Sequence, residues 1–248
     1  MRVYAAIQCG IGKEQCEDVV VIGNTTVCDD TAEITLSTGG VVCIADGVGG
    51  NEGGQVASSY VAEQLKSFAD FSENIDETII RNRLLEINYE LIQKGIACGF
   101  PDMATTLTGL VCSEKHKYIV HIGNTRAYAL QGQYLKQLTT DHTVYNRLLK
   151  MGMVDEAAQC KKNEITSCFG GKNAALADNL NVTPCQDFYI MLLTSDGVHE
   201  YISLDEIERL LTADASSGLE KCEVIIKAAK DAGSADDMSV VIIINRED

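Results

Sequence analysis

The sequence predicts an α+β protein: a central β-sandwich of two antiparallel sheets flanked by helix pairs, in α-β-β-α layers. Short apolar runs rich in β-branched residues recur along the 248 residues. Segments with helical periodicity fall in two blocks between these runs, which favours separate layers over alternating β-α-β units. Residues 117–139 contain consecutive strand-like runs joined only by turn residues, which is typical of antiparallel strands.

At least seven strands are expected. Each is rich in Val, Ile, Tyr or Thr and is bounded by Gly, Asn or Asp. They cover residues 18–23, 39–46, 106–112, 117–124, 126–131, 188–196 and 238–245. Within 117–139, the sequences GNT and QGQ are expected to form the turns between antiparallel strands.

Four helices are expected, two in each block. They cover residues 58–71, 76–96, 203–211 and 217–233. In the first helix Val61, Leu65 and Phe68 share one face, and the second helix follows the same 3.6-residue period, so these two should pack as a pair. Both helices of the second block begin with a Ser-x-x-Glu capping-box pattern, at Ser203 and Ser217.

The length and composition predict a single domain, 1–248. Hydrophobic residues make up 46% of the chain, and no Pro/Gly/Ser-rich linker divides it. Residues 152–187 show no sustained period and are expected to form a long excursion with a short helix. Long loops in compact domains are often functional.

Charge and cysteine usage restrict the partners and the compartment. Acidic residues exceed basic ones by 36 − 20 = 16, which opposes binding to nucleic acid or to an anionic membrane and favours cations. Most of this excess is expected to lie on a solvated surface.

The ten cysteines contain no C-x-x-C pair, and the N-terminal residues lack the apolar stretch of a signal peptide. A cytoplasmic location is therefore expected.

The glycine-rich segment after Asp46 does not match a nucleotide-binding loop. A G-x-G-x-x-G fingerprint would need glycine at Glu52, and a phosphate-binding G-x-x-x-x-G-K-[ST] loop would meet Gln55 and Val56 after its second glycine. A tight turn with positive φ angles is the simpler alternative.

Acidic residues flank the expected apolar strands at four places. They are Glu17 and Asp18, Asp46, Asp196, and Asp236 and Asp237. A carboxylate beside a buried strand is costly unless it is paired or coordinated, and strand ends that meet at one edge of a sandwich would bring these groups together. Oxygen ligands select Mg²⁺ or Mn²⁺ over zinc or copper. Two such ions sharing one aspartate would activate a water and neutralise a phosphoryl group. A simple turn at each aspartate is the alternative.

Seven motifs in order resemble those of the metal-dependent, type 2C serine/threonine protein phosphatases. They are CEDV, IADGVGG, ATTLTGLV, IGNTRAYAL, LTTDHT, LLTSDGVHEYI and SADDMSVVII. The resemblance spans nearly the full chain and is closest to compact, stand-alone bacterial members. It implies a binuclear Mn²⁺ or Mg²⁺ centre and hydrolysis of phosphoserine and phosphothreonine by a metal-bridging hydroxide. It also implies phosphoprotein substrates of a serine/threonine kinase, and 152–187 as the family's variable flap. We expect a monomer.

The resemblance also implies the roles of individual residues. Asp46 would bridge both ions and be central to catalysis. Glu17 and the carbonyl of Gly47 would complete the ligands of one ion, while Asp196 and Asp236 would hold the other.

Several residues around these ligands depart from the family's pattern. Asp18 fits the pattern and would orient the metal-bound water. Lys13 stands where a phosphate-binding arginine is usual, and Val48 where some members have a histidine. Asn124 replaces an aspartate that holds a third ion in some members. Asp237 replaces an asparagine, and its role is left open as a further ligand or a charge at the rim.

Two other functions stay open at the level of sequence. One is a catalytically silent relative that binds phosphoproteins, although the retention of the acidic ligands argues against it. The other is a phosphatase of small phosphorylated metabolites.

Overall fold

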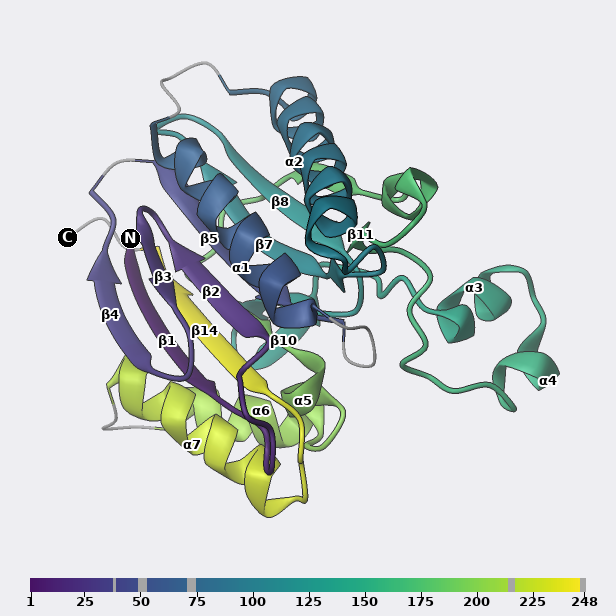
Figure 1. Ribbon diagram of the computed structural model, residues 1–248. Helices are drawn as coiled ribbons and strands as arrows, with labels where there is room; N and C mark the ends of the chain where they lie inside the picture. Colours follow the sequence, from purple (N-terminus) through teal and green to yellow (C-terminus); the bar gives the residue numbers. More distant parts are fainter. Residues whose placement is uncertain (38, 49–52, 71–74, 214–216, 246–248) are drawn as a thin grey trace.

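The computed structural model describes residues 1–37, 39–48, 53–70, 75–213 and 217–245. Two antiparallel sheets lie face to face, with helices on both outer sides (Figure 1). This arrangement confirms the predicted α-β-β-α sandwich. Part of the glycine-rich segment, Gly49 to Glu52, and the predicted end of the first helix at Phe71 lie outside the described residues.

The first sheet has six strands in the order β10-β9-β13-β14-β1-β4. Their bounds are β1 Arg2–Gln8, β4 Thr31–Thr35, β9 Arg126–Gln131, β10 Tyr134–Gln137, β13 Ile190–Thr194 and β14 Met238–Ile244. The N-terminal strand β1 pairs with both β14 and β4, so it lies inside the sheet.

The second sheet has the order β12-β8-β7-β5-β2-β3. Its strands are β2 Asp18–Ile22, β3 Thr25–Val27, β5 Gly40–Asp46, β7 Leu107–Cys112, β8 Lys117–Ile122 and β12 Asn181–Pro184. A two-stranded sheet pairs β6 (Ala104–Thr105) with β11 (Phe169–Gly170).

Helices cover the outer face of each sheet. The helical segments are α1 Gly54–Leu65, η1 Lys66–Asp70, α2 Glu77–Cys98, α3 Val144–Lys150, α4 Val154–Ala157, η2 Ala174–Ala177, α5 Asp196–His199, α6 Leu204–Thr212 and α7 Gly218–Asp231. As predicted, α1 and α2 pack as a pair on the second sheet, whereas α6 and α7 lie on the first. No helix among the described residues is both long and apolar enough to cross a bilayer.

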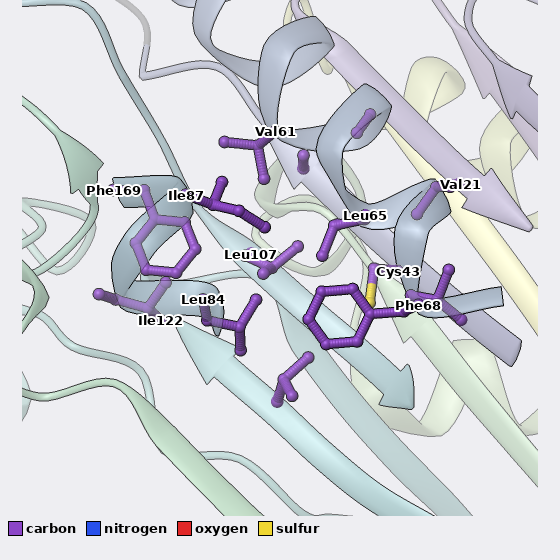
Figure 2. Packing of buried hydrophobic residues seen from close by; sticks show 14 of the residues in the cluster. Val21, Cys43, Val61, Leu65, Phe68, Leu84, Ile87, Leu107, Ile122 and Phe169 are labelled. Atoms are coloured by element: carbon purple, nitrogen blue, oxygen red, sulfur yellow. The ribbon is translucent and has the colours of Figure 1, made fainter. Parts of the chain in front are cut away.

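The alternation of side chains along β5 explains why its sequence is apolar throughout. Val42 and Ile44 point into the layer between the two sheets. Val41 and Cys43 point the other way, into the layer beneath α1 and α2. Figure 2 shows Phe68 beside Cys43 in this second layer. A strand buried on both faces needs hydrophobic residues at every position. Packing on both faces fixes the position of β5.

The predicted turn at QGQ is confirmed, but GNT does not join paired strands. β9 and β10 form an antiparallel hairpin, whereas β8 lies in the second sheet and β9 in the first. The chain therefore crosses between the sheets at residues 123–125. Gly123 has a φ of 108°, and a Cβ there would lie 2.5 Å from the Thr106 side chain, so this crossing requires glycine.

The capping pattern holds fully at only one of the two predicted positions. Ser217 and Glu220 form the reciprocal capping box at the start of α7. At α6, Ser203 accepts a hydrogen bond from the amide of Glu206, but the Glu206 carboxylate pairs with Arg209 instead.

The excursion at 152–187 contains α4, β11, η2 and β12. Its last strand, β12, pairs with β8 and so belongs to the second sheet. Before it, α3 and α4 lie beside each other and project from the sandwich (Figure 1).

Candidate metal and phosphate site

The predicted acidic residues collect at one end of the sandwich. Asp18 at the start of β2 stands directly opposite Asp46 at the end of β5. Asp196 follows β13, and Asp236 precedes β14, the neighbour of β13. A cavity of about 380 Å³ is lined by Asp46, Asp196 and Asp236, together with Gly47. The strand order therefore brings together groups that are up to 218 residues apart in sequence.

The backbone around Asp46 is tightly fixed. The Asp46 carbonyl accepts hydrogen bonds from the Thr105 hydroxyl at 2.9 Å and from the Thr106 amide at 2.8 Å. The Gly47 amide donates to the Glu17 carbonyl at 3.1 Å. These contacts hold Asp46 and Glu17 on adjacent strand ends. Thr105 and Thr106 lie in the motif ATTLTGLV, but sequence reasoning gave neither a role.

Two glycines make room for the Glu17 side chain. A Cβ on Gly47 would lie 2.9 Å from the Cβ of Glu17, and a Cβ on Gly54 would lie 2.5 Å from its Oε1. Both distances are too short for real contacts. Bare backbone after Asp46 therefore allows the Glu17 carboxylate to approach this strand end.

Burial and mutual repulsion disfavour the charged forms of the clustered carboxylates. Burial raises the pKa of Asp46 well above its usual value, and the carboxylates of Asp18 and Asp196 raise it further. The pKa of Asp196 is also raised, by burial and then by Asp236. Burial raises the pKa of Asp18 to about 7, although Asp18 accepts a hydrogen bond from the Ser239 hydroxyl at 2.7 Å. Such a cluster favours a bound cation.

Lys13 supplies the cation nearest to this cluster. Its Nζ lies 2.6 Å from Oδ1 of Asp236, 2.9 Å from Oδ2 of Asp237 and 3.6 Å from Oε2 of Glu17. The structure thus brings Lys13 to the predicted site, where it contacts the acidic residues.

Asp237 lies inside the protein and not at the rim, since only 3% of it is exposed. Its Oδ1 accepts a hydrogen bond from the Gly10 amide at 2.7 Å. Its Oδ2 accepts from the Glu17 amide at 2.8 Å and from Lys13 Nζ. Asp237 therefore ties together both ends of the loop between β1 and β2.

Asn124 is buried beside Asp196. Its Nδ2 donates a hydrogen bond to Oδ2 of Asp196 at 2.8 Å. This contact stabilises the charged form of Asp196 and holds its side chain at the cavity.

The carboxylate oxygens of this cluster are suitable ligands for hard divalent cations, although they do not converge on a single point. In this arrangement no three Asp, Glu, His or Cys side chains of the described ranges converge at metal-binding distance. Lys13 Nζ donates a hydrogen bond to Asp236, and Asn124 Nδ2 donates one to Asp196, so each of these carboxylates already has a polar partner. All the donors are nevertheless oxygens, and their repulsion would be relieved by a hard cation such as Mg²⁺ or Mn²⁺.

Comparisons with known proteins agree with this fold. The model of the protein phosphatase 2C family matches residues 21–224. Protein phosphatase PhpP of Streptococcus pneumoniae is 34% identical over 218 residues, which cover 84% of this chain and 87% of that protein.

Solved structures share the architecture. The serine/threonine phosphatase PstP/Ppp of Mycobacterium tuberculosis aligns over 100% of both chains with a TM-score of 0.82 and 23% identity. The catalytic domain of PstP in complex with two manganese ions aligns over 98% of both chains, with a TM-score of 0.73 and 23% identity. At these identities the structures support the fold alone. The family match over residues 21–224 and the 34% identity to PhpP show that this chain belongs to the protein phosphatase 2C family.

Proposed function

We propose that this protein is a metal-dependent serine/threonine phosphatase that hydrolyses phosphoserine and phosphothreonine in proteins. The buried carboxylate cluster at one end of the sandwich is the observation that carries the proposal. Family membership and the similarity to PhpP support it.

The proposed metal ligands are the residues that line the 380 Å³ cavity and the adjoining strand end. Asp46, Glu17 and the carbonyl of Gly47 would hold one ion, and Asp46, Asp196 and Asp236 would hold the other. When bound, two Mn²⁺ or Mg²⁺ ions supply an activated water and neutralise charge on the phosphoryl group. The two manganese ions of the similar PstP structure support this stoichiometry.

Three further residues position the reacting groups. Asp18, held by the Ser239 hydroxyl, orients water next to Asp46. Lys13 binds the substrate phosphate, and its contacts with Asp236 and Asp237 hold its ammonium group beside the carboxylate cluster. Asn124 orients Asp196.

We also propose a single catalytic domain over residues 1–248, with 152–187 as its flap. The substrates are phosphoproteins of a serine/threonine kinase, and the protein acts as a cytoplasmic monomer. The excess of 16 acidic residues supports the expectation that it binds neither nucleic acid nor membranes.

The test is hydrolysis of an aryl phosphate with and without divalent ions, followed by matched panels of phosphopeptides and phosphorylated metabolites. We expect turnover with Mn²⁺ or Mg²⁺, none in excess chelator, and a preference for phosphopeptides. Turnover in excess chelator would contradict the metal dependence. Absence of turnover with either ion would favour a silent phosphoprotein-binding protein, and a preference for metabolites would identify the other alternative.

A further inference from the structure

A second cavity, of about 600 Å³, adjoins the proposed catalytic cavity. The two share Asn124, Lys161 and Asn163 in their walls. A substrate whose phosphate enters the first cavity therefore has a hollow beside it for a neighbouring part of its chain.

The ion pair between Arg126 and Asp141, whose charges cancel, forms one wall of the second cavity. Nε of Arg126 lies 3.0 Å from each carboxylate oxygen of Asp141, and Nη2 of Arg126 lies 2.7 Å from Oδ2. Asp141 is 7% exposed, so this bidentate pair is fixed and largely shielded. Arg126 is thus already neutralised and is not the group that selects a ligand.

The remaining basic groups of this cavity are Lys161 and Lys162. Neither ammonium group lies within ion-pair distance of a carboxylate in the parts of the chain that the structure describes. Lys162 Nζ lies 5.6 Å from the centre of the Tyr145 ring, a contact that holds a cation without neutralising it.

A single further acid, Glu200, lines the cavity. Its Oε2 accepts a hydrogen bond from Nδ2 of Asn163 at 3.3 Å, so the amide of Asn163 engages one of its oxygens. With the Arg126–Asp141 pair neutral, two lysines and one glutamate leave this cavity with a net positive charge, although the net charge of the whole chain is −16.

We propose that the second cavity is a subsite for an anionic side chain of the substrate. That side chain is an aspartate, a glutamate or a second phosphorylated residue near the residue that is dephosphorylated. The polar walls disfavour an apolar side chain, and the two lysines disfavour a basic one. This inference rests on the proposed phosphatase function and adds a sequence preference to it.

The experiment compares phosphopeptides that differ only by Asp or Asn at each of the three positions on either side of the phosphorylated residue. A third series carries phosphoserine at those positions. The enzymes are the natural protein, the double variant Lys161→Ala/Lys162→Ala, and Lys150→Ala as the matched control. Lys150 is also exposed and belongs to α3, but it does not line the cavity. An aryl phosphate, too small to reach the subsite, reports on the catalytic cavity alone.

In the natural protein we expect kcat/KM to be about three- to tenfold higher for the acidic peptide at one or more positions, as for one or two partly exposed charge pairs. The double variant should lower this ratio to about one, and Lys150→Ala should keep it. Raising the ionic strength should reduce it. A larger gain from phosphoserine than from aspartate would identify phosphate as the preferred anion.

Equal rates for acidic and neutral peptides at every position would overturn the subsite, as would a preference that survives the double substitution. In both cases hydrolysis of the aryl phosphate would leave the proposed function intact. Failure of the natural protein on the aryl phosphate with Mn²⁺ would instead overturn the proposed function, and the subsite with it.

Discussion

Lys13 and Asp237 form an ion pair, with 2.9 Å between Nζ and Oδ2, where the loop between β1 and β2 meets the start of β14. The buried Asp237 carboxylate accepts hydrogen bonds from three donors, two of them amides of this loop. An asparagine has only one acceptor oxygen and would present its NH₂ group to a donor. The two departures from the family's pattern, lysine for arginine and aspartate for asparagine, therefore support each other.

Replacement of Asp237 by asparagine should loosen the loop that carries Lys13 and Glu17. We expect the free energy of unfolding to fall by about 1–3 kcal/mol, because a buried donor loses its acceptor. KM should also rise. Urea denaturation and steady-state kinetics measure the two effects. Asp187→Asn is the control, since the side chain of Asp187 is fully exposed. Equal behaviour of the two variants would show that Asp237 is not an anchor.

Changes at Lys13 separate phosphate binding from chemistry. If Lys13 binds the phosphate in the ground state, Lys13→Ala should raise KM more than it lowers kcat, and Lys13→Arg should retain binding through its fork of donors. A surface lysine without a role would leave the kinetics of both variants unchanged. The double variant Lys13→Ala/Asp237→Asn should be less destabilised than the sum of the single changes, because the two residues are in contact.

Asp46 should be the acid whose replacement is most damaging. Loss of a residue that only hydrogen-bonds to a metal ligand commonly lowers metal affinity or activity about 10- to 100-fold. Asp46 is proposed as a ligand itself, so Asp46→Asn should lower kcat/KM by more than about 100-fold. Mn²⁺ should raise the melting temperature of the natural protein by binding to the folded state, and this rise should be lost in Asp46→Asn. Asp187→Asn serves again as the control. A normal rise with Mn²⁺ in Asp46→Asn would refute its role as the shared ligand.

The sequence predicted most of the strands that are buried on both faces, such as β5, because their apolar runs are continuous. It did not predict β1, β3, β4, β6, β11 or β12. β1 is buried, but two of its seven residues are alanine, which is depleted in strands. The edge strand β4 alternates exposed and half-buried residues, β3 has three residues, and β12 lies within the irregular excursion. Such strands owe their conformation to neighbours that are distant in sequence, and local pattern carries little of that information.

The candidate site shows the same limit. The carboxylates at strand ends could be found in the sequence because each interrupts an apolar run. The contact of Lys13 with Asp237 spans 224 positions, and no local signal pairs the two residues. Ser239, in β14, donates a hydrogen bond to Asp18. It lies two positions after Asp237, and the period of two along a strand was a usable signal for that position.

His121 should make the protein less stable in acid. Burial, together with the nearby His142, lowers the pKa of His121 to about 3, and its Nε2 donates to the Thr140 carbonyl. The folded state disfavours protonation of His121. The contribution of neutral His121 to the free energy of unfolding is therefore complete above the unfolded pKa of 6.5 and is lost as the pH falls below that value. The part of the free energy of unfolding that is due to His121 should fall by about 1.4 kcal/mol per pH unit in this range.

Urea denaturation between pH 7.5 and 5 measures that slope. His121→Gln cannot be protonated, so its free energy of unfolding should fall less steeply with pH than that of the natural protein, whatever its absolute stability. Identical slopes in the two proteins would assign the acid sensitivity to other groups.

Asn124→Asp tests how many metal ions the site holds. In the natural protein the Asn124 amide donates to Asp196 at 2.8 Å, whereas an aspartate would face it with a second negative oxygen. Without metal, the variant should therefore be less stable than the natural protein. A third divalent ion beside two others is strongly repelled, and an added carboxylate offsets part of that repulsion. Titration followed by the electron paramagnetic resonance of free Mn²⁺ should give two tight ions in the natural protein and a third only in the variant. Three tight ions in the natural protein would refute this, because the neutral Asn124 would then suffice as a ligand.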